Sequence, residues 1–363
     1  MNNSKKKSPG TYIIAEAGVN HNGCIETAHK LVDVAAASGA DAVKFQTFQA
    51  HKLATIDAPK ATYQGITTDR NESQWEMLHK LELNHSAHLI LRDYCDEQGI
   101  EFLSTPFDLE SAHFLVEGVK VSRLKIPSGE LTNGPFLLGV ARLGVPVILS
   151  TGMSTLGEIG EALAVLAHGF IGSDEIPSRE AFIQALCSIE GQSKLRELVT
   201  LLHCTSEYPA PLSSVNLRAM STVETAFGLP VGYSDHTNGI TVPIAAVARG
   251  ATIIEKHFTL DRLAPGPDHV ASLEPDELTS MVKSIREVEE VLGGGRKLVS
   301  FSEWGNRTIA RKSLVARKPV NRGDLVSEEH LEALRPAAGV SPMDYWRWIG
   351  KRAEHGYETG EPL

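Results

Sequence analysis

Two histidines end successive apolar, β-branched runs, and their spacing could support chemistry. His236 ends PVGYSDH, and His257 lies in TIIEKHF, the next such run along the chain. If both runs are neighbouring parallel strands, the two imidazoles can meet at one divalent ion, with oxygen ligands from substrate or water. Mn²⁺ or Mg²⁺ suits that ligand set, and Zn²⁺ is an alternative. A structural, hydrogen-bonded role for each histidine is the other interpretation.

The residues before His236 do not form a catalytic triad, although Ser, Asp and His follow one another there. Side chains alternate along a strand, so Ser234 and His236 share one face while Asp235 points to the other. An Asp–His–Ser relay therefore cannot form within this segment.

Two lysines in other strand-like runs could hold an anion. Lys44 lies in AVKFQTF and Lys125 in RLKIPSG, and hydroxyl-bearing residues end the neighbouring runs. Two ammonium groups with hydroxyl donors can bind a phosphate or carboxylate without a glycine-rich phosphate loop. The alternative is that each lysine pairs with Glu16 or Glu130, and both arrangements can hold in one site.

The elements that carry these residues are eight short apolar runs, separated by patterns with a helical period such as IETAHKLVDVAAASGA. Eight strand–helix repeats predict an α/β fold, a (β/α)8 TIM barrel. An open doubly wound sheet is the alternative, but the sequence contains no GxGxxG or P-loop motif. Two longer gaps, Gln49–Glu97 and Thr155–Leu198, should form lids or additional helices. The runs begin at Tyr12, Ala42, Glu101, Arg123, Pro146, Thr200, Pro230 and Thr252.

Polar residues end all eight runs, as expected of a barrel whose site lies at the carboxyl ends of its strands. Buried lysine and glutamate are costly unless they are paired or used, so packing alone explains this pattern poorly. The stiff loop PGPDH further places Asp268 near the end of the last run. The polar residues, run by run, are Glu16; Lys44 and Gln46; Ser104 and Thr105; Lys125, Ser128 and Glu130; Ser150 and Thr151; His203, Thr205, Ser206 and Tyr208; Ser234, Asp235 and His236; Glu255 and His257.

The sequence changes in character near Asn306, which predicts a second, smaller domain. Before it, ELTSMVKSIREVEEVLGGG indicates an amphipathic helix closed by glycines. After it come short strand-like pieces, a Gly-Asp turn and a short helix opened by Ser327. We expect a barrel domain over 1–295, a linker over 296–307 and a compact domain over 308–363.

Composition excludes several classes of protein. With 35 Lys+Arg against 45 Asp+Glu, the net charge of the 363-residue chain is −10, which argues against a nucleic-acid binder or a binder of acidic membranes. The four cysteines form no CxxC pair and are expected to be reduced thiols. The polar amino terminus predicts no secretory leader, and no apolar run reaches the roughly 18 residues of a membrane span. We expect a cytoplasmic protein.

Motifs distributed over nearly the whole chain resemble those of the sialic-acid (nonulosonate) synthases, which condense phosphoenolpyruvate with an N-acylated amino sugar. The resemblance implies a TIM barrel followed by a small antiparallel domain of the antifreeze-like (SAF, β-clip) type, which covers the substrate. It also implies a divalent cofactor, Mn²⁺ or Mg²⁺, and a domain-swapped homodimer. The matching segments are IAEAGVNHNG, AVKFQTF, LSTPFD, LKIPSGELTN, PVILSTGMS, LLHCTSEYP, VGYSDHT, EKHFTLDR, PGPDHVASLEP, RKSLVA and LRP.

The resemblance also implies roles for individual residues. Glu130 would act between the two substrates, with Glu16 and Lys125 as further catalytic residues. His236 and His257 would bind the metal. The groups that hold phosphoenolpyruvate would be Lys44, Thr105, Lys125, Ser128, Ser206 and Ser234. The sugar would contact Glu16, Tyr208, Asp268 and, from the partner subunit, Arg335.

One position separates two branches of this family. The N-acetylneuraminate branch usually has Asn two residues before the tyrosine that matches Tyr208, and this chain has Ser206, followed by Glu207. CTSEYPAP, GYSDHT and EKHFTLD resemble the N,N′-diacetyllegionaminate branch more closely, which makes Ser206 and Glu207 the predicted specificity positions. N-acetylneuraminate synthesis from N-acetylmannosamine is the alternative.

Two other functions are remote alternatives. A Schiff-base aldolase would use Lys44 or Lys125 as its nucleophile, and borohydride trapping would detect its imine. A non-catalytic sugar-binding or ice-binding protein would need only the carboxyl-terminal domain, and would leave the polar strand ends without a role.

Overall fold

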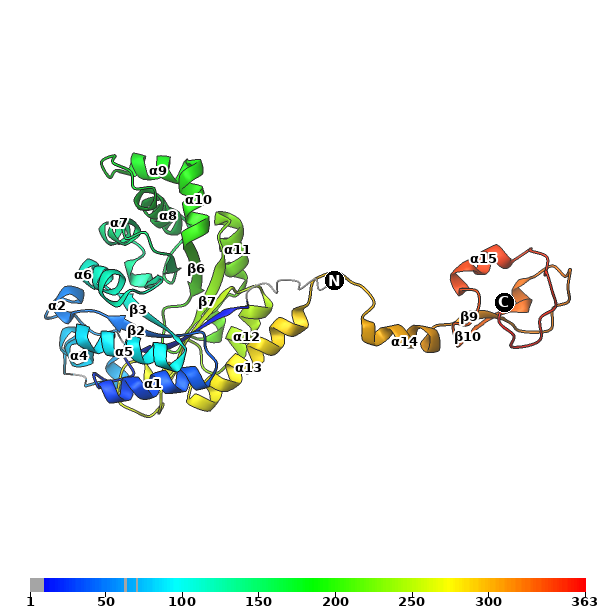
Figure 1. Ribbon diagram of the computed structural model, residues 1–363, viewed down its shortest axis with the longest axis horizontal. Helices are drawn as coiled ribbons and strands as arrows, with labels where there is room; N and C mark the ends of the chain where they lie inside the picture. Colours follow the sequence, from blue (N-terminus) through cyan, green and yellow to red (C-terminus); the bar gives the residue numbers. More distant parts are fainter. Residues whose placement is uncertain (1–9, 62–63, 70) are drawn as a thin grey trace. The chain divides into compact units, whose positions relative to one another are not determined.

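The structure is a computed structural model that describes residues 10–61, 64–69 and 71–363 (Figure 1). The chain divides into two compact units, one extending to Gly293 and the other running from Gly294 to Leu363. Within the described ranges, no helix combines the length and apolar character that crossing a bilayer requires.

The first unit is a barrel of eight parallel strands surrounded by helices (Figure 1). The strands pair in the order β3-β2-β1-β8-β7-β6-β5-β4, and the two ends of this order, β3 and β4, lie in contact. The predicted (β/α)8 fold is therefore confirmed, with a barrel that backbone pairing nearly closes. The strands are β1 Tyr12–Gly18, β2 Ala42–Thr47, β3 Glu101–Pro106, β4 Leu124–Ile126, β5 Val147–Ser150, β6 Val199–Cys204, β7 Val231–Asp235 and β8 Ile253–His257.

A principal helix follows each strand, and local sequence sets where several of them begin and end. A capping box opens the helix after β5, because Thr155 Oγ1 accepts from the Glu158 amide while the Glu158 carboxylate accepts from the Thr155 amide. The helix after β2 ends at Gly99, whose left-handed φ of 71° suits glycine. These helices are α1 Ile25–Ala37, α5 His85–Gln98, α6 Leu109–His113 with a π-helical turn Phe114–Val119, α7 Gly134–Arg142, α8 Leu156–Phe170, α11 Arg218–Phe227, α12 Thr241–Ala248 and α13 Pro275–Leu292.

The two long gaps in the repeat contain additional helices, as the sequence predicted. The first gap supplies α2 Ala50–Leu53, α3 Gln64–Thr67 and α4 Gln74–Leu81, and the second supplies α9 Arg179–Cys187 and α10 Ile189–Leu198. Met77, Leu78 and Leu81 of α4 pack with Val19 and Phe48, which follow β1 and β2. The first insertion therefore packs at the end of the barrel where β1 and β2 finish. Three 3₁₀ turns complete the unit, Ser128–Glu130, Leu212–Ser214 and His269–Ala271.

The barrel interior has an apolar layer below a polar one, because side chains on one face of a strand recur every two residues. The apolar layer is a cluster separate from the core under the helices. On each strand that contributes to this layer, the residue two positions later is polar or a cysteine. The rise of about 3.3 Å per residue puts the second layer about 7 Å nearer the carboxyl ends. The apolar residues are Ile14, Ala42, Leu103, Ile148, Leu202 and Ile253. The residues two positions later are Glu16, Lys44, Thr105, Ser150, Cys204 and Glu255.

A fully buried ion pair joins β7 to β8 on the face opposite the barrel interior. Lys256 Nζ lies 2.6 Å from Asp235 Oδ2, and both side chains are 0% exposed. The Asp235 carboxylate also accepts from the amide and hydroxyl of Thr237, while Lys256 donates to the Thr237 carbonyl. The alternation expected at 234–236 is thus present, because Asp235 points away from the interior that Ser234 and His236 face.

Replacing Lys256 with methionine should lower the free energy of unfolding by about 3–5 kcal/mol, since the Asp235 charge would stay buried without its partner. Thermal and urea unfolding followed by circular dichroism would measure this change. Lys283→Met, on the exposed face of α13, is the matched control and should lie within about 0.5 kcal/mol of the parent. Equal stability of the two variants would show that the pair contributes nothing.

The second unit has a small antiparallel sheet with its own core. β9 Ser313–Ala316 pairs with β10 Leu331–Leu334, and the cluster beneath contains Ala316, Val320, Val326, Leu331, Ala353 and Tyr357. The short helix expected after Ser327 is a single 3₁₀ turn, Glu328–His330. The helix α14 Phe301–Ala310 lies across position 308, the predicted boundary between the linker and the second domain. The remaining elements are the 3₁₀ turn Pro342–Asp344 and α15 Tyr345–Trp348.

Candidate active site

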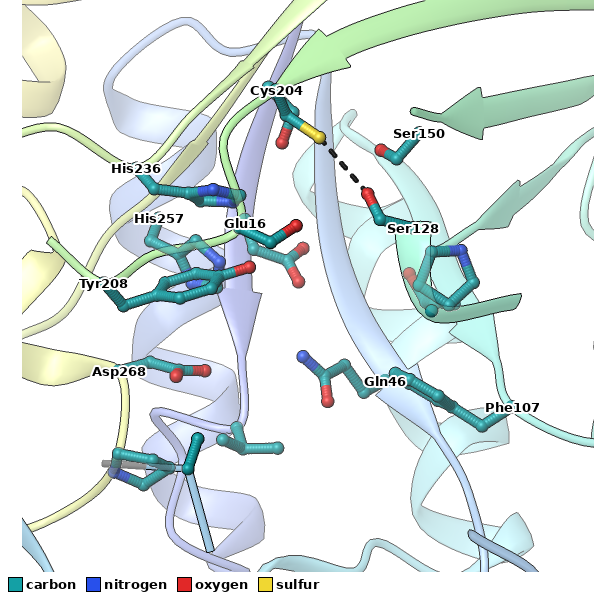
Figure 2. A pocket seen from close by; sticks show the side chains of 18 of the residues that line it. Glu16, Gln46, Phe107, Ser128, Ser150, Cys204, Tyr208, His236, His257 and Asp268 are labelled. Carbon is teal, nitrogen blue, oxygen red and sulfur yellow. Dashed lines mark hydrogen bonds between the residues drawn. The ribbon is translucent and has the colours of Figure 1, made fainter. Parts of the chain in front are cut away.

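A cavity of about 520 Å³ opens at the carboxyl ends of the barrel strands (Figure 2). This volume is within the range of small-molecule sites and leaves room for two small substrates. Side chains from the polar layer form its floor, and the PGPDH loop, the first insertion and residues that follow several other strands supply the rest of its lining. The cavity lies where a (β/α)8 barrel usually carries its chemistry.

Two buried lysines and two buried glutamates form a connected charge cluster on the floor. Lys44 Nζ lies 2.7 Å from Glu16 Oε2 and 3.5 Å from Glu255 Oε2, and Lys125 Nζ lies 3.2 Å from Glu255 Oε1. The Ser234 hydroxyl donates to Glu255 Oε1 at 2.8 Å. Register explains the assembly, because Glu16 is paired with Lys44 across β1–β2, and Ser234 with Glu255 across β7–β8.

The surroundings of Glu16 and Glu255 shift the pKa values of the two carboxyl groups in opposite directions. Burial raises the pKa of Glu16 to about 7, with the nearby Glu255 charge adding to the effect against the opposing influence of Lys44. Burial also disfavours ionised Glu255, but the ammonium groups of Lys125 and Lys44 outweigh it and hold the Glu255 pKa well below its usual value. Glu255 is therefore the fixed anion, and Glu16 is the carboxyl suited to exchange a proton near neutral pH.

Because Gly152 has no side chain, three residues of the cavity lining, Ser128, Cys204 and Ser206, pack close to its Cα, and we call this part of the cavity the recess. The Gly152 amide donates to Ser128 Oγ at 2.9 Å, and Ser128 Oγ lies 3.2 Å from Cys204 Sγ. A Cβ on Gly152 would come within 2.3 Å of Ser206 Oγ and 2.9 Å of Cys204 Sγ, so only glycine fits without displacement. Ser150 Oγ is buried and has no hydrogen-bond partner among the residues that the structure describes (Figure 2). These hydroxyls next to two ammonium groups can bind an anion.

Across the cavity, His236, His257 and Tyr208 form an aromatic group (Figure 2). The two imidazole centroids are 5.6 Å apart, and the Tyr208 ring lies 4.1 Å from His236 and 5.7 Å from His257. Burial lowers the pKa of His236 to about 4 and that of His257 well below its usual value, so both rings are neutral at pH 7. His236 Nδ1 must carry the proton, because it donates to the Thr205 carbonyl at 2.6 Å.

This histidine pair fits part of a metal site. A backbone carbonyl that fixes the tautomer of His236 leaves its Nε2 free to coordinate, which is the usual arrangement behind a metal-binding histidine. Within the described ranges, His257 Nδ1 is buried without a hydrogen-bond partner. No group of three or more His, Cys, Asp or Glu side chains in the described part of the chain is arranged to hold a metal ion. Remaining ligands would therefore have to be oxygens from substrate or water.

Asp268 enters the cavity on the loop after β8. Hydrogen bonds tie this loop to the segment after β1, because Asn22 donates to the Pro265 carbonyl at 3.0 Å and Asn20 donates to Ser272 Oγ at 3.0 Å. Ser272 Oγ in turn donates to the Asp268 carbonyl at 2.7 Å. Burial raises the pKa of the Asp268 carboxyl to about 6. The loop therefore presents a carboxyl group that can bond the hydroxyls of a polar ligand.

The structure brings together most of the predicted site residues of the first unit, and two others of that unit, Glu130 and Glu207, do not line the cavity. Glu130 does not line the cavity, and its carboxylate accepts from the Asn133 side chain at 2.6 Å. Glu207 is exposed outside the cavity, and Arg335 is an exposed residue of the second unit. The cavity is lined by Glu16, Lys44, Thr105, Lys125, Ser128, Ser206, Tyr208, Ser234, His236, His257 and Asp268.

Sequence reasoning gave no role to several residues that the structure places in the site. Lys125 pairs with Glu255, whereas the alternative considered from sequence paired each lysine with Glu16 or Glu130. A signal for Glu255 was present, because it lies two residues before His257 and therefore on the same face of its strand. Cys204 carried the same signal, because it lies two residues after Leu202 on β6, whereas Gly152 follows β5 and carried none.

Comparison with known proteins agrees with this geometry. The NeuB family model matches residues 31–297, and the SAF domain model matches residues 311–363. The chain is 49% identical to the N,N'-diacetyllegionaminic acid synthase of Campylobacter jejuni, covering 97% of this chain and 98% of that protein. It is 44% identical to the N,N'-diacetyllegionaminic acid synthase of Legionella pneumophila, covering 97% and 93%.

A solved structure shows the same architecture. The N-acetylneuraminic acid synthetase of Leptospira borgpetersenii aligns with a TM-score of 0.66 and 32% identity, covering 82% of this chain and 90% of that one. Family matches, extended identity and shared fold all agree. The chain therefore belongs to the NeuB family, and its second unit is a SAF domain.

Proposed function

We propose that this chain condenses phosphoenolpyruvate with 2,4-diacetamido-2,4,6-trideoxymannose to form N,N'-diacetyllegionaminic acid and phosphate. The observation that carries the reaction class is the cavity floor, where Lys44 and Lys125 adjoin the hydroxyl groups around Gly152 and face two neutral imidazoles. The identities of 49% and 44% to two diacetyllegionaminic acid synthases support the choice of sugar. Since phosphoenolpyruvate is a metabolite of the cytoplasm, we place the reaction there.

In this proposal the lysines and hydroxyls hold phosphoenolpyruvate. Lys44 and Lys125 offset the charge of its phosphate and carboxylate, and Thr105, Ser128, Ser206 and Ser234 donate hydrogen bonds. The two cations already sit among carboxylates in the free protein, so the substrate would share them with Glu16 and Glu255. A buried cluster of this kind is already organised before the substrate binds, which limits the reorganisation needed at the transition state.

The reaction forms a carbon–carbon bond and a bond between C2 and the oxygen of water, and it breaks the C2–oxygen bond to phosphate. The enol π electrons of phosphoenolpyruvate attack the sugar aldehyde through C3, and the aldehyde oxygen takes up a proton. We assign that proton to Glu16, whose pKa is raised to about 7. Water then adds at C2 and loses one proton to a base, and the tetrahedral carbon expels phosphate, which takes the remaining hydroxyl proton as C2 becomes a carbonyl. Glu130 remains the base predicted for the water, although in the free protein its carboxylate contacts Asn133.

His236 and His257 would hold a divalent ion, for which Mn²⁺ or Mg²⁺ suits two imidazoles completed by oxygen ligands. When bound, such an ion supplies Lewis acidity toward a carbonyl oxygen. Tyr208 and Asp268 lie on the same side of the cavity and would contact the hydroxyls of the sugar (Figure 2).

We also propose that Arg335 of the SAF domain grips the N-acyl group of the sugar in the partner subunit of a domain-swapped dimer. Support comes from the resemblance and from the exposure of the Arg335 side chain. Light scattering coupled to size exclusion tests the dimer, and a monomer that retains full turnover would refute it.

The test of function is phosphate release from phosphoenolpyruvate with Mn²⁺, comparing 2,4-diacetamido-2,4,6-trideoxymannose with N-acetylmannosamine. We expect the trideoxy sugar to give the higher kcat/KM, with a nonulosonic acid of the matching mass as product. Preference for N-acetylmannosamine would make the chain an N-acetylneuraminate synthase. No phosphate release with either sugar would contradict the proposal.

Gly152→Ala should raise the KM for phosphoenolpyruvate about tenfold or more, because the new methyl group would displace Ser206 and Cys204 from their places in the cavity lining. Steady-state kinetics would measure this KM, and the KM for the sugar should change less. Gly157→Ala in α8 is the matched control, because its Cβ would lie 3.8 Å from Thr155 Oγ1, an ordinary van der Waals contact. An unchanged KM for phosphoenolpyruvate in Gly152→Ala would remove the recess from the substrate site.

A further inference from the structure

Opposite its charged floor, the cavity has an apolar wall. We call it the roof, defined as Leu53 on α2, Met77, Leu78 and Leu81 on α4, and Phe107 after β3. All but Phe107 belong to the first insertion in the barrel repeat. The described residues that this insertion contributes to the lining are apolar or carry an amide, and none of them is charged.

The roof is a packed element rather than a loose loop. Met77, Leu78 and Leu81 are 3%, 9% and 7% exposed, and they pack against Val19 and Phe48. These contacts attach α4 to the segments that follow β1 and β2. An apolar surface held in this way can discriminate between substituents by shape and by polarity.

Hydrogen bonds and charges anchor the helices that carry the roof. Ser73 and Glu76 form a capping box at the start of α4. At its end the Glu82 carboxylate accepts from the Ala50 amide of α2 at 2.5 Å. Glu72 pairs with Lys80 at 2.6 Å. Replacement of a single roof side chain should therefore leave the wall in place.

The charged floor and the apolar roof together set the direction in which the sugar binds in the cavity. Its aldehyde carbon must meet phosphoenolpyruvate beside Lys44 and Lys125, so the carbons far from the aldehyde extend away from the floor toward the insertion. There they meet apolar side chains together with the amides of Gln46, Gln64 and Gln74. A methyl group and an acylamino group match such a wall, because amides can bond the acyl carbonyl and N–H while the methyls stay dry.

We infer that the roof is the specificity element of this enzyme, selecting a C6 methyl and a C4 acylamino group over hydroxyls. This inference rests on the proposed function. It moves specificity away from Glu207, which is exposed, and from Ser206, which lies at the recess beside Gly152. A hydroxyl facing the roof would give up its water without gaining a partner, which disfavours N-acetylmannosamine.

The experiment compares three sugars in the full-length Mn²⁺-loaded enzyme: 2,4-diacetamido-2,4,6-trideoxymannose, 2-acetamido-2,6-dideoxymannose and N-acetylmannosamine. The second differs from the third only at C6, so the series separates the methyl from the C4 acylamino group. Met77→Gln and Leu53→Gln each place an amide on the roof. Ile56→Gln makes a comparable change at an insertion residue that is 66% exposed and does not line the cavity.

We expect each roof variant to lower the ratio of kcat/KM for the trideoxy sugar to that for N-acetylmannosamine by about 10- to 200-fold. The KM for phosphoenolpyruvate should stay the same, and Ile56→Gln should leave the ratio unchanged. Met77→Leu, which keeps an apolar side chain, should retain most of the preference. Thermal unfolding of each variant identifies any loss of fold, and the second roof position then supplies the measurement.

The measurements distinguish an error in the proposed substrate from an error in the role of the roof. If the parent enzyme does not prefer the trideoxy sugar, the proposed function is wrong in its substrate. If the parent prefers it and folded roof variants keep the same ratio, the function stands and the roof is not the specificity element.

Discussion

His236→Ala is expected to lose metal-stimulated turnover and tight Mn²⁺ binding together. His236 is one of two neutral, buried imidazoles in the cavity, and its tautomer is fixed by the hydrogen bond from Nδ1 to the Thr205 carbonyl. Losing several kcal/mol of Lewis-acid stabilisation corresponds to about 10³-fold or more in kcat. Phosphate release as a function of Mn²⁺ would measure the activity.

Binding of Mn²⁺ to the metal-free protein, followed by electron paramagnetic resonance, separates loss of the ion from damage to the fold. His113→Ala, an exposed histidine on α6, provides the control and should bind Mn²⁺ as the parent does. Binding of phosphoenolpyruvate by His236→Ala should persist, because all of its proposed ligands except Ser234 lie on or after other strands. Full metal-stimulated turnover in His236→Ala would refute the ligand assignment.

Lys125→Met is expected to lower kcat/KM for phosphoenolpyruvate by about 10²–10³-fold. The side chain is 9% exposed, and its ammonium group lies 3.2 Å from Glu255 Oε1. Methionine keeps much of the volume and removes the charge, so the effect should appear both as a higher KM and as a lower kcat. Steady-state kinetics at saturating sugar would measure both constants.

Lys125→Met should not unfold the protein, because Glu255 has partners in the charge cluster besides Lys125. Without Lys125, Glu255 keeps Lys44 at 3.5 Å and the Ser234 hydroxyl at 2.8 Å, so the protein should still fold. Lys283→Met on α13 removes the same charge far from the cavity and should leave the kinetics unchanged. A Lys125→Met enzyme with normal kcat/KM would show that phosphoenolpyruvate binds elsewhere.

Much of the cavity floor could be predicted from the sequence, because strand alternation is a local property. An apolar residue such as Ile14 or Ile253 fills the barrel, and the residue two positions later, Glu16 or Glu255, must face the same interior. The ends of eight parallel strands meet at one end of the barrel, so polar residues far apart in the sequence converge without further information.

The pairing of charges could not be predicted in this way. Lys125 shares Glu255 with Lys44, although Glu130 is closer to it in sequence. Strand order and register decide which carboxylate reaches which ammonium group, and Glu130 falls in a 3₁₀ turn where it contacts Asn133 instead. Sequence proximity is therefore a poor guide to partners in a barrel.

The sequence by itself determined the family, the repeat of strands and helices, and eleven of the side chains that line the cavity. Only the tertiary structure decided that the insertion over Gln49–Glu97 forms an apolar roof, that Gly152 leaves a recess, and that Glu207 stays outside. The physical reason is that some interactions join residues close together in the sequence, whereas others join residues far apart in it. Alternation and capping act within a few residues, whereas the path of an insertion depends on contacts such as those of Met77 with Val19 and Phe48, which only the folded chain provides.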